Sequence, residues 1–143
     1  HRRNVEQMAT IQNHSKTIDG ITYSTSTLPA SKGLVILPKL TGLFGEALMG
    51  LFFATDEEDR EELLQNPQVI AAAITTIAEK AAASDGLLVI RDLLTSTEAD
   101  LVRVGEAEVP GSVYTHFDGH FSGRYRHLVE VAFWVGSVNF AGP

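Results

Sequence analysis

The last third of the chain, residues 109–140, carries aromatic and aliphatic side chains at helical spacing almost to the C-terminus. At about 100° per residue, one broad face of such a helix is apolar, whereas Asp118 and Arg126 fall on the opposite side. The apolar face collects Val113, Phe117, Phe121, Leu128, Val131, Val135 and Val138. Further apolar side chains, among them Trp134, lie outside this face. We therefore expect one long C-terminal helix that is either buried in its own domain or covered on its second face by another molecule.

The composition is that of a folded globular chain. Its 143 residues are 44% hydrophobic and 20% charged, which is enough apolar surface to close one core. The net charge of −7 repels phosphate backbones, so we expect no nucleic-acid partner. Because the chain has no cysteine, disulfides, thiolate metal sites and a cysteine nucleophile are excluded.

We expect neither a secretory signal sequence nor a membrane span in the N-terminal region. The most apolar early stretch, 33–53, approaches the length of a membrane helix, but a proline and two charged residues interrupt it. The first ten residues are polar, and the first methionine is Met8. We set residues 1–16 apart as an N-terminal segment whose part before Met8 need not be native, and we expect 17–143 to form a single globular domain.

The first half of this domain predicts a hairpin followed by a helix. Asp19-Gly20 joins two β-prone runs, and this dipeptide is typical of a tight hairpin turn. The hairpin ends at Leu28-Pro29, and apolar spacing predicts a helix from Ala30 onward. Pro38 is expected to kink or split this helix.

The middle of the chain predicts three further helices. A capping box at 55–58 starts a short helix that ends at Leu64, and Asn66-Pro67 supplies an N-cap followed by proline at the first helical position. Another short helix over 87–94 and a strand over 101–109 precede the C-terminal helix. The predicted fold class is α+β and predominantly α-helical, with an N-terminal β-hairpin packed on a helical body and a long C-terminal helix.

His116, Asp118 and His120 form the most metal-like cluster, since two histidines four residues apart share one helical face. On a helix, however, Asp118 points about 160° away from His120. No glutamate follows His116 as a hydrolytic zinc motif requires, and the chain has neither a nucleophile elbow nor a phosphate-binding loop. We therefore expect no metal, no cofactor and no enzyme, and keep a metal-dependent enzyme using both histidines as an alternative.

Residues 56–62 contain six acids, a run that is typical of a solvated face and that would also speed association with a basic partner.

Core burial is the competing interpretation for the apolar side chains of the C-terminal helix. Trp134 and Phe140 are the stronger apolar candidates, since one lies off the main face and the other lies near the chain end. The candidate partner-binding residues are Phe121, Leu128, Trp134, Phe140, Asp56, Glu57, Glu58, Asp59, Glu61 and Glu62.

The order of these segments resembles the small tail assembly chaperones of long-tailed bacteriophages and prophages. The resemblance is carried by the hairpin end at 27–34, the leucine-rich stretch at 40–45, the alanine-rich middle helices and the final 138–140. It covers most of 17–140, and Pro38 inside the leucine-rich helix is a departure from it.

This resemblance implies a non-enzymatic chaperone in the host cell cytoplasm. Such a protein would bind the tape-measure protein, keep its apolar helices soluble, and deliver it to the tail tube protein, in many families with help from a longer frameshifted form. We expect the candidate apolar residues to take part either in partner binding or in self-association into a homo-oligomer. The alternative hypothesis is a structural virion subunit, such as a tail-completion or baseplate protein.

Overall fold

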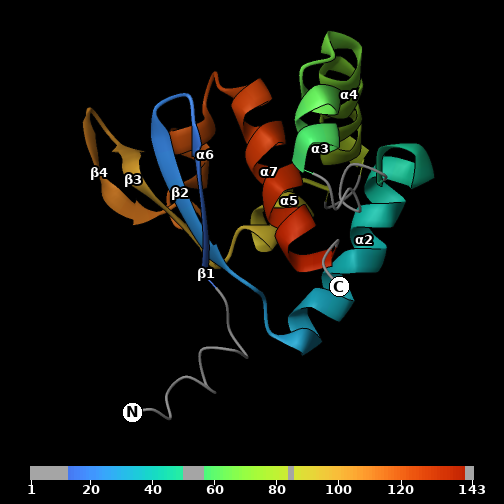
Figure 1. The fold of residues 1–143 in the computed structure, drawn as a ribbon, viewed down its shortest axis with the longest axis horizontal. Helices are drawn as coiled ribbons and strands as arrows, with labels where there is room; N and C mark the ends of the chain where they lie inside the picture. The colour runs from blue at the N-terminus through green and yellow to red at the C-terminus, as the bar shows by residue number, and fades with distance from the viewer. Residues whose placement is uncertain (1–12, 50–56, 84–85, 141–143) are drawn as a thin grey trace.

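The structure, a computed structural model, describes residues 13–49, 57–83 and 86–140. A four-stranded antiparallel sheet in the order β1-β2-β3-β4 forms one side of the molecule, and helices form the other (Figure 1). The strands are β1 (Asn13–Ile18), β2 (Ile21–Ser26), β3 (Thr97–Val104) and β4 (Ala107–Ser112).

The predicted fold class is wrong in its account of the β structure. The N-terminal hairpin does not pack alone on a helical body, because β2 pairs with β3 through Tyr23 opposite Ala99 and Thr25 opposite Thr97. The hairpin is therefore half of a sheet whose other half comes from the second part of the chain.

The predicted strand over 101–109 spans the turn between β3 and β4. Gly105 has a φ of +63°, which lets the backbone reverse at this position. Pro110 and Gly111, which directly follow the predicted strand, lie inside β4. A proline is tolerated there because β4 is an edge strand, where a missing N–H need not remove a ladder hydrogen bond.

The hairpin turn at Asp19-Gly20 is confirmed. Both residues have positive φ, 50° for Asp19 and 83° for Gly20, as the hairpin turn that fits the strand twist requires. Ile18 pairs with Ile21 across the turn, and both side chains are buried. The alternation that follows places Tyr23 on the same inward face.

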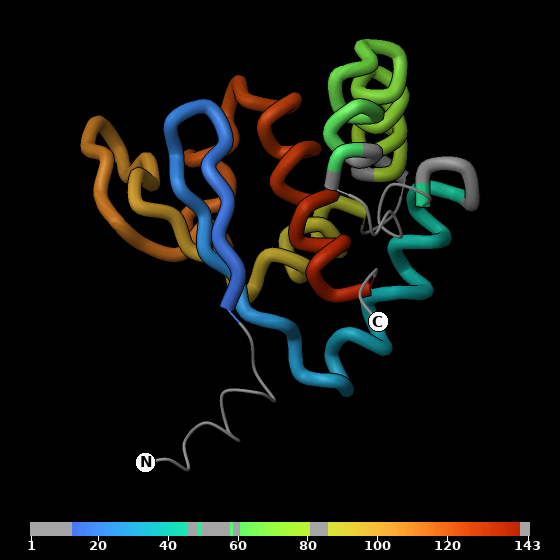
Figure 2. Tube along the Cα trace, viewed as in Figure 1, coloured from blue at the N-terminus to red at the C-terminus, as the bar shows by residue number. Residues whose placement is uncertain are grey.

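Six helices accompany the sheet among the described residues: α2 (Ala30–Met49), α3 (Glu57–Leu64), α4 (Pro67–Ala83), α5 (Gly86–Leu93), α6 (Phe117–Phe121) and α7 (Tyr125–Phe140). The last of them, α7, runs between the sheet and the outer helices (Figures 1 and 2). Within 127–137 every residue of α7 except Glu130 is buried. The second face of this helix is therefore covered inside the chain, by the sheet on one side and by α4 and α5 on the other.

The expectation of one long C-terminal helix within 109–140 is wrong in its first part. The structure has a five-residue α6 and a separate α7, with a break between Phe121 and Tyr125. Gly123 in this break has a φ of +75°, a conformation that ends a helix and that side chains other than glycine rarely adopt. The break lets α6 turn away from α7.

Pro38 stays inside α2, and the backbone leaves the helical conformation instead at Gly45, with φ 78° and ψ 168°. The predicted start of α4 is confirmed, since Asn66 Oδ1 accepts a hydrogen bond from the Gln68 N–H at 2.9 Å and Pro67 is the first helical residue. The predicted capping residue Thr55 lies outside the described residues.

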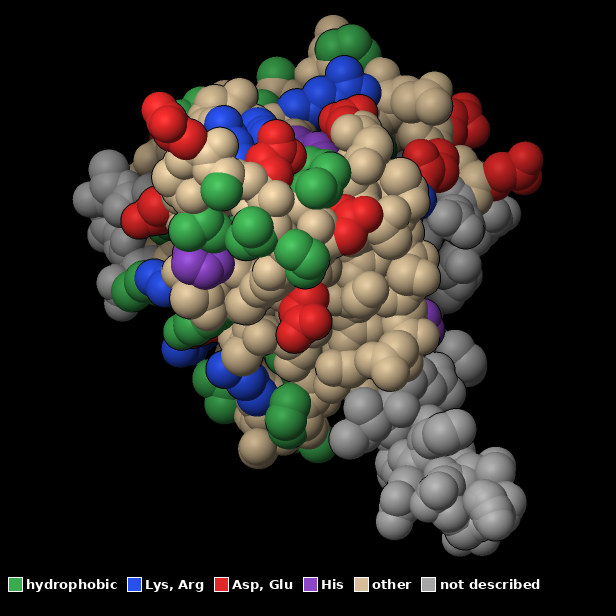
Figure 3. Space-filling view, turned by 90° about the vertical axis from the view of Figure 1, so that its left-hand side faces the viewer, with side chains coloured by type: hydrophobic (Ala, Val, Ile, Leu, Met, Phe, Trp, Pro, Cys, Tyr) green, Lys and Arg blue, Asp and Glu red, His purple; other side chains and the backbone are tan. Residues whose placement is uncertain are grey.

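The sheet side of the molecule presents acidic, basic and hydrophobic side chains scattered among polar residues and backbone (Figure 3). On this side Thr17 and Thr22 form a cross-strand hydroxyl contact of 3.0 Å, and the Thr22 N–H donates to Asp100 at 3.0 Å. None of the helices in the described ranges combines the length and the apolar character that crossing a membrane requires.

Candidate functional site

An apolar cavity of about 440 Å³ opens where α4, α5, α6 and α7 meet, and we call it the apolar pocket. Its position follows from the break at Gly123, because α6 and α7 diverge there and leave space beside α4. Among the side chains that line it are Ile74, Ile77, Leu87, Phe121, Tyr125 and Leu128. A cavity with this lining is suited to apolar side chains rather than to charged substrates.

The rim of the apolar pocket exposes large side chains. Tyr125 is 59% exposed and Leu87 is 39% exposed, so both are accessible to a binding partner. Phe121 and Leu128 lie deeper, at 3% and 5% exposed. The structure thus brings two of the predicted partner-binding residues together in one cavity.

The other two apolar candidates lie elsewhere on α7. Trp134 is 5% exposed and belongs to the hydrophobic core. Phe140 is half-buried at the end of α7 and packs against the same core. Neither residue lines the apolar pocket.

The predicted acidic residues belong to α3, which does not line the apolar pocket. Glu58 and Glu62 are exposed, whereas Glu61 is half-buried and forms an ion pair with Lys16 of β1. This pair ties the hairpin to the helical side. The side chains that lie outside the described residues are those of Asp56, Glu57 and Asp59.

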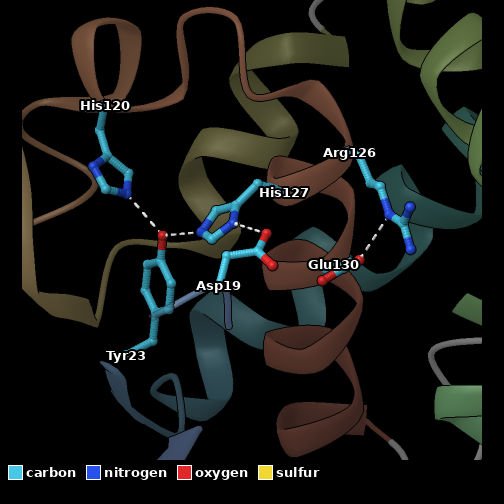
Figure 4. A network of polar contacts seen from close by, with 6 residues as sticks. All are labelled: Asp19, Tyr23, His120, Arg126, His127 and Glu130. Atoms are coloured by element: carbon cyan, nitrogen blue, oxygen red, sulfur yellow. Dashed lines mark hydrogen bonds and ion pairs between the residues drawn. The ribbon is translucent and has the colours of Figure 1, made fainter. Parts of the chain in front are cut away.

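A network of polar side chains surrounds the hydroxyl group of Tyr23 and touches the lining of the apolar pocket where His120 contacts Phe121 (Figure 4). The hydroxyl is 2.7 Å from Nε2 of His120 in α6, and it also contacts Nε2 of His127 in α7. His127 Nδ1 is 3.2 Å from a carboxylate oxygen of Asp19 in the hairpin turn. The network therefore connects the sheet to both C-terminal helices.

The hydrogen bonds assign one proton arrangement to this network. The Arg103 backbone N–H donates to Nδ1 of His120 at 3.4 Å, so the proton of the neutral ring lies on Nε2 and is donated to the Tyr23 oxygen. The Tyr23 hydroxyl then donates to Nε2 of His127, whose Nδ1–H donates to Asp19.

Burial keeps both central groups uncharged. It lowers the pKa of His120 from 6.5 to about 4, and the positive charge of Arg124 acts in the same direction. Burial also raises the pKa of Tyr23 well above its ordinary value of 10.0, against a smaller opposing effect of Arg124. A neutral histidine and a neutral tyrosine whose polar atoms bond to each other are suited to holding helices and sheet together.

The cluster of His116, Asp118 and His120 does not come together as a ligand set. His120 points at Tyr23, while Asp118 is exposed and His116 precedes α6. In the part of the chain that the structure describes, no three His, Asp or Glu side chains could hold a metal ion together. The partner that sequence spacing missed is His127, whose ring lies 6.3 Å from that of His120 and shares the Tyr23 hydroxyl with it.

The fold and the pocket together define a small sheet-and-helix protein with an apolar cavity between its helices. Comparison with protein families gives a match to the phage tail assembly chaperone protein family, TAC, over residues 19–143. The chain belongs to this phage tail assembly chaperone family. No curated protein and no solved structure matches it.

The family match includes all the elements discussed above except β1. It begins at Asp19 in the hairpin turn and contains the apolar pocket and the Tyr23 network. The predicted resemblance is therefore confirmed, and the role of the chain lies in tail assembly.

Proposed function

We propose that this chain binds apolar side chains of the tape-measure protein in the apolar pocket and keeps them from aggregating until the tail is built. The observation that carries the proposal is the pocket itself, with exposed Leu87 and Tyr125 at its rim and buried Phe121 and Leu128 below. Exposed apolar surface around a cavity is a mark of a protein-binding site.

The size of the apolar pocket fits anchor side chains of a helix. A cavity of about 150 Å³ holds one benzene ring, so a cavity of about 440 Å³ has room for roughly two large apolar side chains. An amphipathic helix presents such side chains at i and i+3 or i+4, and inserts them together into a groove between helices. We infer that one helical turn of the tape-measure protein occupies each pocket.

Charge supports the chaperone role. The chain carries a net charge of −7, and Glu58 and Glu62 of α3 are exposed. Like charge on each bound copy keeps loaded complexes apart and opposes precipitation. Binding of several copies along one tape-measure protein, their self-association, and delivery to the tail tube protein in the host cytoplasm belong to the same proposal.

Co-expression with the tape-measure protein from the same gene neighbourhood tests the proposal. We expect a soluble complex in which light scattering finds several copies of this chain per tape-measure protein. A Tyr125→Ala variant removes an exposed ring from the pocket rim and should recover less tape-measure protein. A matched Val109→Ala variant truncates an exposed apolar side chain of β4 that does not line the pocket, and it should recover the wild-type amount.

Purified virions distinguish the chaperone from a structural subunit. A chaperone that leaves when the tail is complete should be absent from finished particles. Stoichiometric presence of the chain in the virion, together with an insoluble tape-measure protein on co-expression, would contradict the proposal and favour the tail-completion or baseplate alternative.

A further inference from the structure

We propose that Arg91 and Arg103 form a binding site for a carboxylate side chain of the same partner segment that occupies the apolar pocket. The inference rests on the proposed function, and it adds a polar specificity element to it. It predicts that the partner carries Asp or Glu beside its apolar anchors.

The site is a second cavity, of about 280 Å³, between the β3–β4 turn, α5 and the start of α6, and we call it the arginine cleft. Both arginines line it, together with Thr115, His116 and Asp118. Two of the eleven basic residues of an acidic chain thus share one cavity. Such a concentration of guanidinium groups fits a planar anion.

Protein contacts hold both guanidinium groups in place. Arg91 Nε donates to the Tyr114 carbonyl at 3.1 Å, and the group lies over the Tyr114 ring, 4.7 Å from its centroid. One terminal nitrogen of Arg103 donates to the carbonyls of His120 at 2.9 Å and Ser122 at 2.6 Å. Because the side chains are already ordered, a ligand does not have to order them on binding.

These contacts leave donors for a ligand. Arg91 uses only Nε, so both of its terminal nitrogens make no hydrogen bond to the described residues. Arg103 keeps its second terminal nitrogen, and its buried Nε has no partner in the described part of the chain. Two terminal nitrogens on one guanidinium match the two oxygens of a carboxylate.

The arginine cleft adjoins the apolar pocket. Phe117 and Asp118 line both cavities, so the two cavities adjoin at α6. A peptide segment with an apolar side chain in the pocket therefore reaches the cleft with a neighbouring residue. This juxtaposition identifies the ligand as a side chain of the pocket-bound partner.

The charges around the cleft favour one carboxylate over a polyanion. Asp118 is exposed at the boundary and reduces the positive potential of the two arginines. The net charge of −7 repels a nucleic acid or another extended phosphate polymer. A carboxylate carried on an apolar helix meets the arginines without bringing further negative charge.

Affinities for the captured tape-measure protein test this site in four variants. Arg91→Gln and Arg103→Gln should each weaken binding about tenfold, since each removes a charge-assisted hydrogen bond. Asp118→Asn should strengthen binding a few fold, because it removes a like charge from the cleft boundary. Arg126→Gln is the matched control, since Arg126 pairs with Glu130 and lines neither cavity.

The Asp118→Asn variant keeps the test decisive if an arginine variant does not fold, because Asp118 is exposed and a damaged protein would not gain affinity. Unchanged or weaker binding by Asp118→Asn, or wild-type affinity in folded Arg91→Gln, would overturn the proposal. Titration with sodium acetate separates the source of the carboxylate. One contrary result is that acetate shifts the arginine Nε–H NMR signals while the two glutamine variants bind the tape-measure protein with unaltered affinity. That result would mean that the cleft binds a small free carboxylate instead of a side chain of the partner.

Failure of this inference can be told from failure of the proposed function. Leu87→Asp should abolish tape-measure binding if the apolar pocket is the docking site. If Leu87→Asp weakens binding and both arginine variants do not, only the arginine cleft is refuted. If Leu87→Asp binds normally, the pocket itself is refuted.

Discussion

The hydroxyl group of Tyr23 in β2 lies 2.7 Å from Nε2 of His120 in α6, so a strand near the start of the chain is bonded to a helix near its end. Both side chains are fully buried. The ring of His120 also contacts Phe121 edge-on, with ring centroids 4.7 Å apart, and Phe121 lines the apolar pocket. The Tyr23 network therefore holds one wall of the pocket against the sheet.

Removal of the Tyr23 hydroxyl should destabilise the protein. Tyr23→Phe leaves Nε2 of His120 and Nε2 of His127 buried without a partner, at a cost of about 2 kcal/mol in the free energy of unfolding. Urea unfolding measures the loss. Tyr125→Phe is the matched control, since Tyr125 is 59% exposed and outside the network, and a loss of equal size in both variants would contradict the account.

The stability of the fold should fall as the pH drops from 6.5 toward 4. In the folded state the pKa of His120 is lowered to about 4 by burial and by Arg124, whereas the unfolded chain takes up a proton near 6.5. The unfolded state binds more protons in this window, so the free energy of unfolding rises with pH there, by up to about 3 kcal/mol.

Urea unfolding at several pH values gives this slope, and NMR titration gives the pKa of His120 directly. In a folded His120→Gln variant, the part of the slope that His120 contributes should disappear. A His120 pKa near 6.5 in the folded protein, or an unchanged slope in the variant, would show that the ring is not held neutral by its surroundings.

Two glycines should respond to alanine in opposite directions. Gly123 has a φ of +75° and open space where a Cβ would lie, so Gly123→Ala adds only backbone strain and should cost about 1 kcal/mol. Gly42 lies inside α2 with open space around it and an ordinary φ, so Gly42→Ala should stabilise the fold by about 0.5 kcal/mol. Thermal unfolding of both variants measures the difference, and equal shifts would refute the assigned backbone roles.

The features that were predictable from sequence depend on neighbouring residues. Asp19-Gly20 adopts positive φ at both turn positions, and Asn66-Pro67 starts α4, because each motif acts through its own backbone. The pairing of β2 with β3 joins Thr25 to Thr97, and no local pattern indicates which strands meet over such a separation. The sheet was therefore beyond what the hairpin motif alone could predict.

The candidate site likewise has a part that local sequence could predict and a part that it could not. Helical spacing identified Phe121 and Leu128 as apolar positions, and both line the apolar pocket. Spacing grouped His120 with His116, whereas the fold pairs His120 with His127 through Tyr23. The break at Gly123 explains the error, because it changes the direction of the chain between the two partnered histidines.

The apolar pocket is the central claim, and a pair of leucine variants tests it most directly. Leu87 at the pocket rim is 39% exposed, and Leu101 on β3, outside the pocket, is 37% exposed. The measurement is the affinity of Leu87→Asp and Leu101→Asp for the tape-measure protein, with both variants verified as folded. We predict that Leu87→Asp loses binding at least tenfold and that Leu101→Asp binds like the wild type. Equal affinity of the two variants would contradict the claim that the tape-measure protein docks in this pocket.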